Sequence, residues 1–207
     1  TTAVNARISN NGQSCIAGKR FVVHQDVYDA FVELFVSKMS ALVVGDPLNP
    51  ETQVGPLATE RGRQEIADLV DDARSHGAQI LTGGSAPDMP GWFYQPTIVA
   101  GLKPGMRLVM EEAFGPVASV YKVSSRDEAA AIANQTTFGL SSALWTEDDD
   151  DTEFFIKNIE AGAVFINGMT ISYPELPFGG VKDSGFGREL GAPGIREFCN
   201  FKTVWKA

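Results

Sequence analysis

The 207 residues carry 17 basic and 26 acidic side chains, so the formal net charge is −9 at pH 7. An acidic surface argues against nucleic acid or an anionic membrane as the main partner, and no apolar run approaches the roughly 20 residues of a membrane helix. Hydrophobic residues make up 43% of the chain, enough for one domain with a substantial core. The two cysteines have no framework spacing, which favours free thiols in a reducing, cytoplasmic setting.

The first third of the chain predicts a helix, a strand and a second helix. Residues 1–9 have the pattern of a helix interior, and residues 19–24 are β-branched and aromatic, as in a strand. A helix begins at Asp26, whose charge suits an N-cap or a first turn. Its apolar stripe, which we expect to face the core, consists of Val27, Phe31, Leu34, Phe35, Met39 and Leu42.

The remaining elements alternate between helices and strands. Helices are predicted over 59–76, from Ser125 or Asp127 to Asn134, and over 148–161. Strands are predicted over 78–82, 92–99, 107–110, 116–123, 140–145 and 163–167. This alternation predicts an α/β domain whose largely parallel sheet is flanked by helices. Residues 198–206 alternate apolar and polar side chains, which is typical of a strand with a free edge.

Cys15 is the candidate nucleophile. It lies in N-N-G-Q-S-C-I-A-G-K-R (residues 10–20), a polar segment with a glycine turn ahead of an apolar run. A thiolate on an exposed turn is a good nucleophile, and nearby backbone N–H groups or cations stabilise it. The residues alone leave open the alternative that Cys15 is a small buried apolar side chain.

This segment resembles the nucleophile segment of the aldehyde dehydrogenase superfamily. Three further blocks follow in the order that the family shows: E-E-A-F-G-P-V (111–117), Asn167, and P-F-G-G-V-K-D-S-G-F-G-R-E (177–189). Together the four blocks cover nearly the whole chain. The run F-I-N-G-M-T-I-S-Y-P-E-L-P (165–177) is most similar to bacterial NADP-dependent succinate-semialdehyde dehydrogenases.

The resemblance implies a role for several residues. Cys15 would attack a small-molecule aldehyde, succinate semialdehyde on the narrower match, and form a thiohemiacetal and then a thioester. The cofactor would be NADP or NAD, with NADP favoured. Glu112 would hold the ribose hydroxyls of the nicotinamide nucleotide and Phe114 would pack beside the nicotinamide. Phe178 would line the aldehyde pocket.

Other family positions concern the substrate carboxylate and the nucleophile loop. Ser172 occupies the position of a carboxylate-binding serine in several relatives. Some relatives have an arginine five residues before the nucleophile, where this sequence has Asn10. Carboxylate recognition therefore rests on Ser172, Tyr173, Asn10 or groups outside the chain. Asn167 matches a position near the nucleophile, where its amide is expected to brace the loop.

The resemblance also implies a domain organisation. We expect residues 1–189 to form the catalytic domain and residues 190–207 a tail whose strand pairs with a neighbouring subunit, giving a homodimer or homotetramer. An ordinary edge strand in the domain's own sheet is the alternative. Family members carry a dinucleotide-binding domain, the general-base Glu and a second oxyanion donor ahead of the cysteine. We expect these to be absent from this chain, which alone would be inactive.

Alternative functions rest on fewer residues. A thiol hydrolase or acyltransferase would use Cys15 with Gln13 as oxyanion donor and His24 as base. A non-catalytic assembly module would dimerise through the tail. Without the family match, Glu111 and Glu112 are surface charges at a strand end. No metal site is expected, because His24 and His76 lack ligand spacing, and the glycines after 178 fit neither phosphate-loop template.

Overall fold

The computed structural model describes all 207 residues, and its centre is a four-stranded mixed sheet with the order β1-β4-β3-β2. β1 (Arg20–His24), β4 (Val117–Val123) and β3 (Thr97–Ala100) are parallel, and β2 (Gln79–Thr82) is antiparallel at one edge. The prediction of a largely parallel sheet is corrected to this mixed sheet. A loop without a crossover helix joins β2 to β3, and such a connection returns the chain in the opposite direction.

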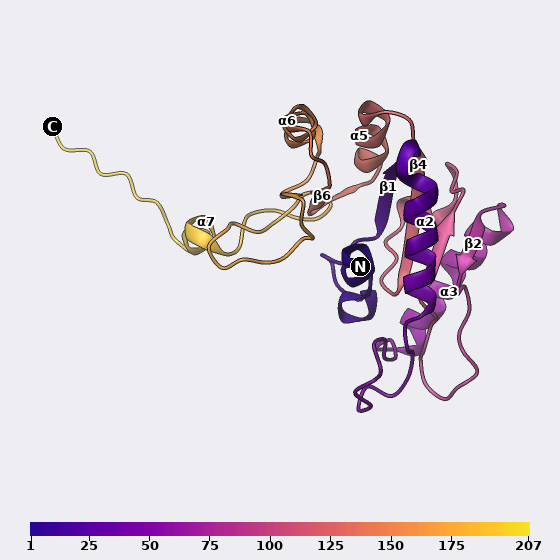
Figure 1. Cartoon of the computed structure of the whole chain (residues 1–207). Coiled ribbons are helices and arrows are strands. Elements are labelled where there is room, and N and C mark those ends of the chain that lie inside the picture. Colours follow the sequence, from indigo (N-terminus) through magenta and orange to yellow (C-terminus); the bar gives the residue numbers. More distant parts are fainter.

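Helices cover both faces of this sheet (Figure 1). On β3, Ile98 belongs to the apolar cluster of Phe35 and Met39 from α2 (Gln25–Ser40). The next residue, Val99, belongs to a cluster with α3 (Glu60–Ser75). Successive strand residues point to opposite faces, so α2 and α1 (Thr2–Ile8) cover one face and α3 the other.

The prediction of a strand over 107–110 is wrong, because these residues form the single-turn helix α4 (Arg107–Met110). The carboxylate of Asp72 in α3 accepts a hydrogen bond of 2.8 Å from the Arg107 backbone N–H at the start of this turn. The Arg107 guanidinium donates two hydrogen bonds to the Glu111 carboxylate, four residues on. These tertiary and local contacts outweigh the β-propensity of the apolar residues between them.

Two further predictions need correction. The strand predicted over 92–99 is confined to β3, since Pro96 has no N–H for a sheet ladder and the residues before it run as a loop. In the stripe of α2, Val27 and Leu34 are exposed, by 57% and 61%. The helix rests on the sheet through Phe35 and Met39, which are buried.

The helix boundaries follow the capping residues. The side chains of Thr59, Ser125 and Asp148 each accept a backbone hydrogen bond at the start of α3, α5 (Arg126–Asn134) and α6 (Asp149–Asn158). At the other end of α3, Gly77 has a φ of +88°. These elements confirm the predicted helices, although α6 ends three residues earlier than predicted.

The C-terminal part extends away from the sheet (Figure 1). It contains the short parallel pair β6 (Ser142–Leu144) and β7 (Val164–Ile166) and the antiparallel pair β5 (Phe138–Gly139) and β8 (Val181–Lys182). The short helix α7 (Gly191–Arg196) follows them. No helix in the chain combines the length and the apolarity needed to cross a lipid bilayer.

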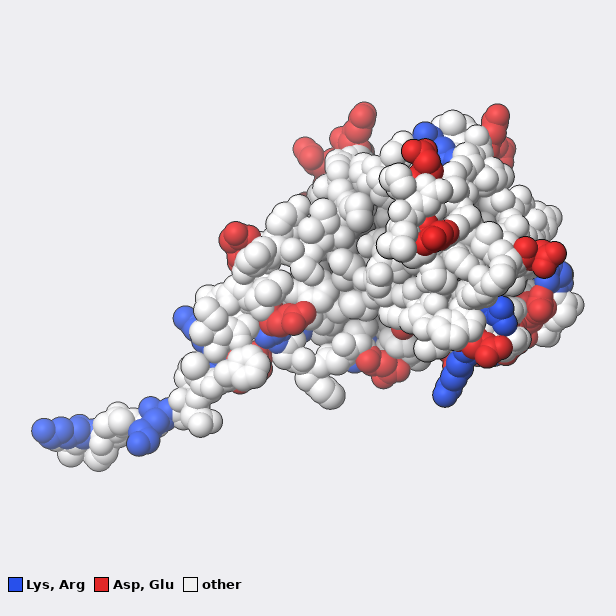
Figure 2. Space-filling model, turned by 90° about the horizontal axis from the view of Figure 1, so that it is seen from below, with Lys and Arg blue, Asp and Glu red and all other residues white.

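The strand predicted over 198–206 is not formed in this chain. The segment projects from the body as an extended tail (Figures 1 and 2), and its apolar side chains are more than 80% exposed. A strand exists only when a neighbour accepts and donates its backbone hydrogen bonds, and no strand of the chain pairs with this segment. Pairing with a neighbouring subunit stays a prediction.

Candidate active site

Cys15 lies on an exposed turn between α1 and β1. After the short 3-10 helix η1 (Ser9–Gly12), the Ala17 N–H donates to the Ser14 carbonyl over 3.1 Å and closes a turn around Cys15. The cysteine is exposed, so the alternative of a small buried apolar side chain is wrong. The thiol is therefore open to a reactant in solution.

The segment before Cys15 has an unusual backbone. Asn10, Asn11 and Gly12 have φ values of +49°, +56° and +77°, in the left-handed region that asparagine and glycine tolerate best. A Cβ on Gly12 would collide with the carbonyl oxygen of Gly115 and lie 2.9 Å from Nη2 of Arg7. The nucleophile loop thus touches the backbone of the 111–117 block.

Two amide side chains fasten this loop to the segment ahead of α3. The Asn11 side chain accepts from the Gly55 N–H at 3.0 Å and donates to the Pro56 carbonyl at 3.3 Å. The Gln13 side-chain oxygen accepts from the Ala58 N–H at 2.8 Å. Each amide side chain provides hydrogen-bond partners for backbone groups of a loop that has no strand pairing to satisfy them. They therefore hold the loop before Cys15 from one side.

Arg7 binds the same loop from the interior of the protein. Its side chain is fully buried and donates to the carbonyl oxygens of Gly12 (2.8 Å) and Val117 (3.1 Å). Burial lowers the pKa of Arg7 to about 10, and Glu112 acts in the other direction. The sequence prediction missed this residue. The one available signal was an arginine near the end of the helix that leads into the nucleophile loop, five residues before Gly12.

Lys19 joins the nucleophile turn to the predicted cofactor carboxylate. Its Nζ lies 3.0 Å from Oε1 of Glu112 and donates to the carbonyls of Ser14 (2.9 Å), Cys15 (3.2 Å) and Ala17 (3.2 Å). Burial and, next, the charge of Arg7 lower the pKa of Lys19, whereas Glu112 and Cys15 act to raise it. The prediction missed Lys19 as well.

A hollow of about 250 Å³ opens beside this cluster. Gln13, Glu112 and Phe114 line one side, and the other side belongs to the start of α3 and the two residues before it. Phe114 is 46% exposed, and its ring centroid lies 6.0 Å from Nζ of Lys19. Glu112 is therefore not a free surface charge at a strand end, because it pairs with Lys19 at the rim of a hollow.

The other predicted residues lie elsewhere. Asn167, with a φ of +53°, accepts from the Thr146 N–H (3.0 Å) and donates to the Thr146 carbonyl (2.8 Å), so its amide braces the end of β6. Phe178 exchanges two backbone hydrogen bonds with Glu189. Ser172 is exposed in a loop. None of the three lines the hollow beside Glu112.

Asn10 remains close to the nucleophile. Its side-chain amide donates to the Gln13 carbonyl at 3.0 Å, two residues before Cys15. One of its two N–H groups is thereby occupied with the turn, and the residue itself is exposed. The structure places Asn10 where it shapes the loop, while contact with a substrate stays a prediction.

His24 is not placed to act as a base for Cys15. It ends β1, and the four residue steps from Arg20 to His24 cover about 13 Å of extended strand. One ring nitrogen lies 3.1 Å from the Ser124 carbonyl, and the other accepts from the Asp26 N–H at 3.4 Å. A general base must lie within hydrogen-bond reach of the proton that it removes. The thiol-hydrolase alternative therefore lacks its base.

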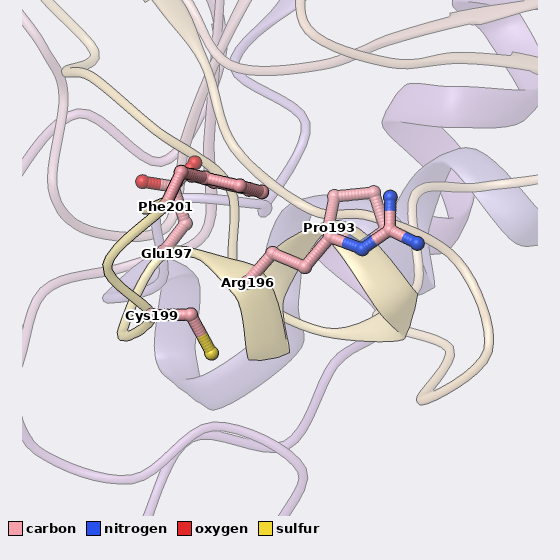
Figure 3. Close-up of a pocket in the computed structure, with 5 residues that line it drawn as sticks. All are labelled: Pro193, Arg196, Glu197, Cys199 and Phe201. Atoms are coloured by element: carbon pink, nitrogen blue, oxygen red, sulfur yellow. The ribbon is translucent and has the colours of Figure 1, made fainter. Parts of the chain in front are cut away.

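A second hollow, of about 390 Å³, lies at the C-terminal end (Figure 3). It is lined by residues of α7 and of the segment that follows: Pro193, Arg196, Glu197, Cys199 and Phe201. The Cys199 thiol donates weakly to the Ile195 carbonyl at 3.6 Å. No predicted site residue lines this hollow.

Comparisons with known proteins show the family of this chain. The model of the aldehyde dehydrogenase family matches residues 1–204. Succinate-semialdehyde dehydrogenase (NADP+) 1 of Mycobacterium ulcerans is 62% identical over 205 residues, which are 99% of this chain and 45% of that protein. The chain thus spans about half the length of the curated relatives that it matches.

Solved structures show the same likeness. The succinic semialdehyde dehydrogenase of Streptococcus pyogenes, solved in complex with NADP+, superposes with a TM-score of 0.94 at 39% identity, over 99% of this chain and 45% of that one. A structure of Gox0499 superposes with a TM-score of 0.95 at 41% identity, over 100% of this chain and 45% of that one. With its sequence matched over residues 1–204 and its fold shared with such enzymes, this chain belongs to the aldehyde dehydrogenase family.

Proposed function

We propose that this chain is the nucleophile-bearing part of an NADP-dependent succinate-semialdehyde dehydrogenase, with Cys15 as the nucleophile. The observation that carries the proposal is the exposed Cys15 turn, which Lys19 ties to Glu112 at the rim of a hollow. The mycobacterial relatives, which are named for this activity and this cofactor, support it. Two cysteines without a disulfide also fit a reducing cytoplasm.

The first chemical step is the formation of a carbon–sulfur bond. The Cys15 thiol gives up its proton to a general base, its sulfur attacks the aldehyde carbon, and the carbonyl electron pair moves onto oxygen. The backbone N–H of Cys15 has no acceptor within the chain, so it is free to donate to that oxyanion. The former aldehyde hydrogen would then leave as a hydride to the bound cofactor, and water would cleave the resulting thioester and return the thiol. We assign the general-base Glu and the second oxyanion donor to the rest of a longer protein.

The residues at the hollow fit a nicotinamide nucleotide. Lys19 forms an ion pair with Oε1 of Glu112, and the other carboxylate oxygen has no partner within the chain. That oxygen remains able to accept hydrogen bonds from a ribose diol, and the exposed Phe114 ring offers a flat apolar surface beside it. Bound NADP+ supplies the acceptor for the aldehyde hydride.

The substrate carboxylate needs hydrogen-bond donors, and this chain offers the Ser172 hydroxyl, the Tyr173 hydroxyl and the free N–H of Asn10. The three residues are exposed and carry no opposing negative charge. We propose that Ser172 is the main contact. The tail over 198–206 pairs with a neighbouring subunit in a homodimer or homotetramer, which would cover its exposed apolar side chains.

The test uses the full-length protein that carries this chain. It should form NADPH from NADP+ and succinate semialdehyde, followed by absorbance at 340 nm. Cys15→Ser should lower kcat by at least about 10³-fold, since the nucleophile is lost. The matched variant Cys199→Ser should keep kcat within about twofold, because Cys199 is the other exposed thiol and lies outside the site. Equal losses from both variants would refute the assignment of Cys15.

A further inference from the structure

Lys19 has an environment that an ordinary surface lysine does not have. Its side chain is 18% exposed, and four oxygen atoms lie within 3.2 Å of Nζ. Three of them are carbonyls from the turn of residues 14–17, and the fourth is a carboxylate oxygen of Glu112. An ammonium group has three protons to donate, so all of them are used inside this cluster.

The carbonyl contacts fix the direction of a neighbouring N–H. The Ser14 carbonyl and the Cys15 N–H belong to one peptide group, and the chain contains no cis peptide bond. In a trans peptide the C=O and N–H bonds point in opposite directions. Because the Ser14 carbonyl points at Lys19 (2.9 Å), the Cys15 N–H points away from it, and it has no acceptor in the chain.

The same ammonium fixes the carboxylate. Glu112 is 35% exposed and has Lys19 as its single charged partner, at 3.0 Å. Arg7 is the second cation of the cluster and lies below the loop. Two cations and one carboxylate leave the cluster with one net positive charge, and Nζ of Lys19 lies 3.2 Å from the carbonyl oxygen of Cys15 itself. Negative charge on the Cys15 sulfur or on a bound oxygen would meet an attractive field.

The geometry points to Lys19 as a positioning residue. It orients the Cys15 N–H toward the reacting oxygen, and it holds the Glu112 carboxylate at a fixed position relative to Cys15. This inference rests on the proposed function. It adds a residue that does not touch substrate or cofactor and acts through two groups that do. The Lys19 side chain thereby fixes both the direction of the oxyanion donor and the position of the cofactor carboxylate.

The first experiment separates kcat from KM in the full-length enzyme. Lys19→Met keeps the aliphatic stem and removes the ammonium. It should lower kcat about 10-fold to 100-fold, because the N–H donor loses its orientation, and raise KM for NADP+ several-fold. Lys19→Arg should recover part of both effects. Lys157→Met, which breaks an exposed ion pair with Glu153 on α6, is the matched control and should change neither.

A second variant shows whether the KM effect passes through Glu112. Glu112→Gln should raise KM for NADP+ by itself. Adding Lys19→Met to Glu112→Gln should then lower kcat again and leave KM for NADP+ nearly unchanged. Independent effects on KM in the double variant, or wild-type kcat and KM in Lys19→Met, would overturn the inference. Circular dichroism and the Tm of each variant show that it is folded.

A third measurement does not depend on dehydrogenase activity. Alkylation of Cys15 is followed by mass spectrometry with neutral iodoacetamide and with anionic iodoacetate. The iodoacetate-to-iodoacetamide rate ratio should fall about threefold or more in Lys19→Met, because one positive charge near the sulfur is lost. It should rise in Glu112→Gln. If wild-type enzyme oxidises no aldehyde, the proposed function fails, and this ratio still decides whether Lys19 acts on Cys15. An unchanged ratio would count against it.

Discussion

Residues 1–135 contain both apolar core clusters, whereas Phe155 is the single buried apolar side chain in residues 136–207. In the first region Cys15 and Glu112 rest on packed helices and strands and are tied together by Lys19. In the second, Phe178 rests on backbone hydrogen bonds within a loop. The difference teaches that the residues predicted as nucleophile and cofactor contact are supported by the packed core of the chain. Phe178, which is predicted to line the aldehyde pocket, has no comparable apolar core beneath it.

The largest expected effect concerns the chain by itself. Residues 1–207 should reduce no NADP+ or NAD+ in the presence of succinate semialdehyde, since the base and the second oxyanion donor are proposed to lie outside the chain. Absorbance at 340 nm checks this, with the full-length protein as the positive control. Sustained cofactor reduction by residues 1–207 would show that the second region completes the site unaided.

Gly12→Ala should be the most damaging single change to the packed region. The new Cβ meets the Gly115 carbonyl and Arg7, and φ at this residue is +77°. We expect a loss of about 3 to 5 kcal/mol in the free energy of unfolding, measured by urea denaturation. Gly185→Ala is the matched variant in the second region. It has a φ of +115° but open space around it, and should cost about 1 to 2 kcal/mol. A larger loss of stability in Gly185→Ala than in Gly12→Ala would contradict the view that the first region is the more tightly packed one.

Arg7→Met comes next in size. It leaves the carbonyls of Gly12 and Val117 without their donor in a buried site. The free energy of unfolding should fall by about 2 to 3 kcal/mol, again measured in urea. Arg61→Met, which breaks an exposed pair with Glu65, should change it by less than about 0.5 kcal/mol. Similar small losses from both variants would mean that Arg7 does not support the loop.

The smallest effect on folding should follow removal of the tail. Deleting residues 198–207 takes away side chains that the rest of the chain does not cover. The free energy of unfolding of the remaining chain should stay within about 0.5 kcal/mol of the original value. In the full-length protein the same deletion should lower the mass of the assembly, measured by light scattering. A large loss of stability in the isolated chain would reveal an internal role for the tail.

Local signals predicted most of the elements of the packed region. Thr59, Ser125 and Gly77 mark helix ends by side-chain oxygens or by a left-handed backbone, and these are properties of single residues. The segment 107–110 was mispredicted because the group that starts its helix, Asp72, is 35 residues away in sequence. A distant cap leaves no trace in a local pattern.

The sequence predicted only some residues of the candidate site. Cys15 and Glu112 lie in motifs that the family resemblance carries. Arg7 and Lys19 were missed because their importance lies in which carbonyls they reach, and carbonyls are the same at every position in a sequence. The absence of an apolar core beneath Phe178 became visible only from the positions of the two core clusters in the structure.

The hydrogen bond from Arg107 to Asp72 has a consequence for protein engineering. It fixes the start of α4 against α3, and α4 leads directly into Glu112, while α3 forms the facing wall of the hollow. Asp72 thus links the elements that carry two sides of the hollow, although it does not line the hollow itself. A substitution at Asp72 would therefore change how these two sides are held together without altering any residue that lines the hollow.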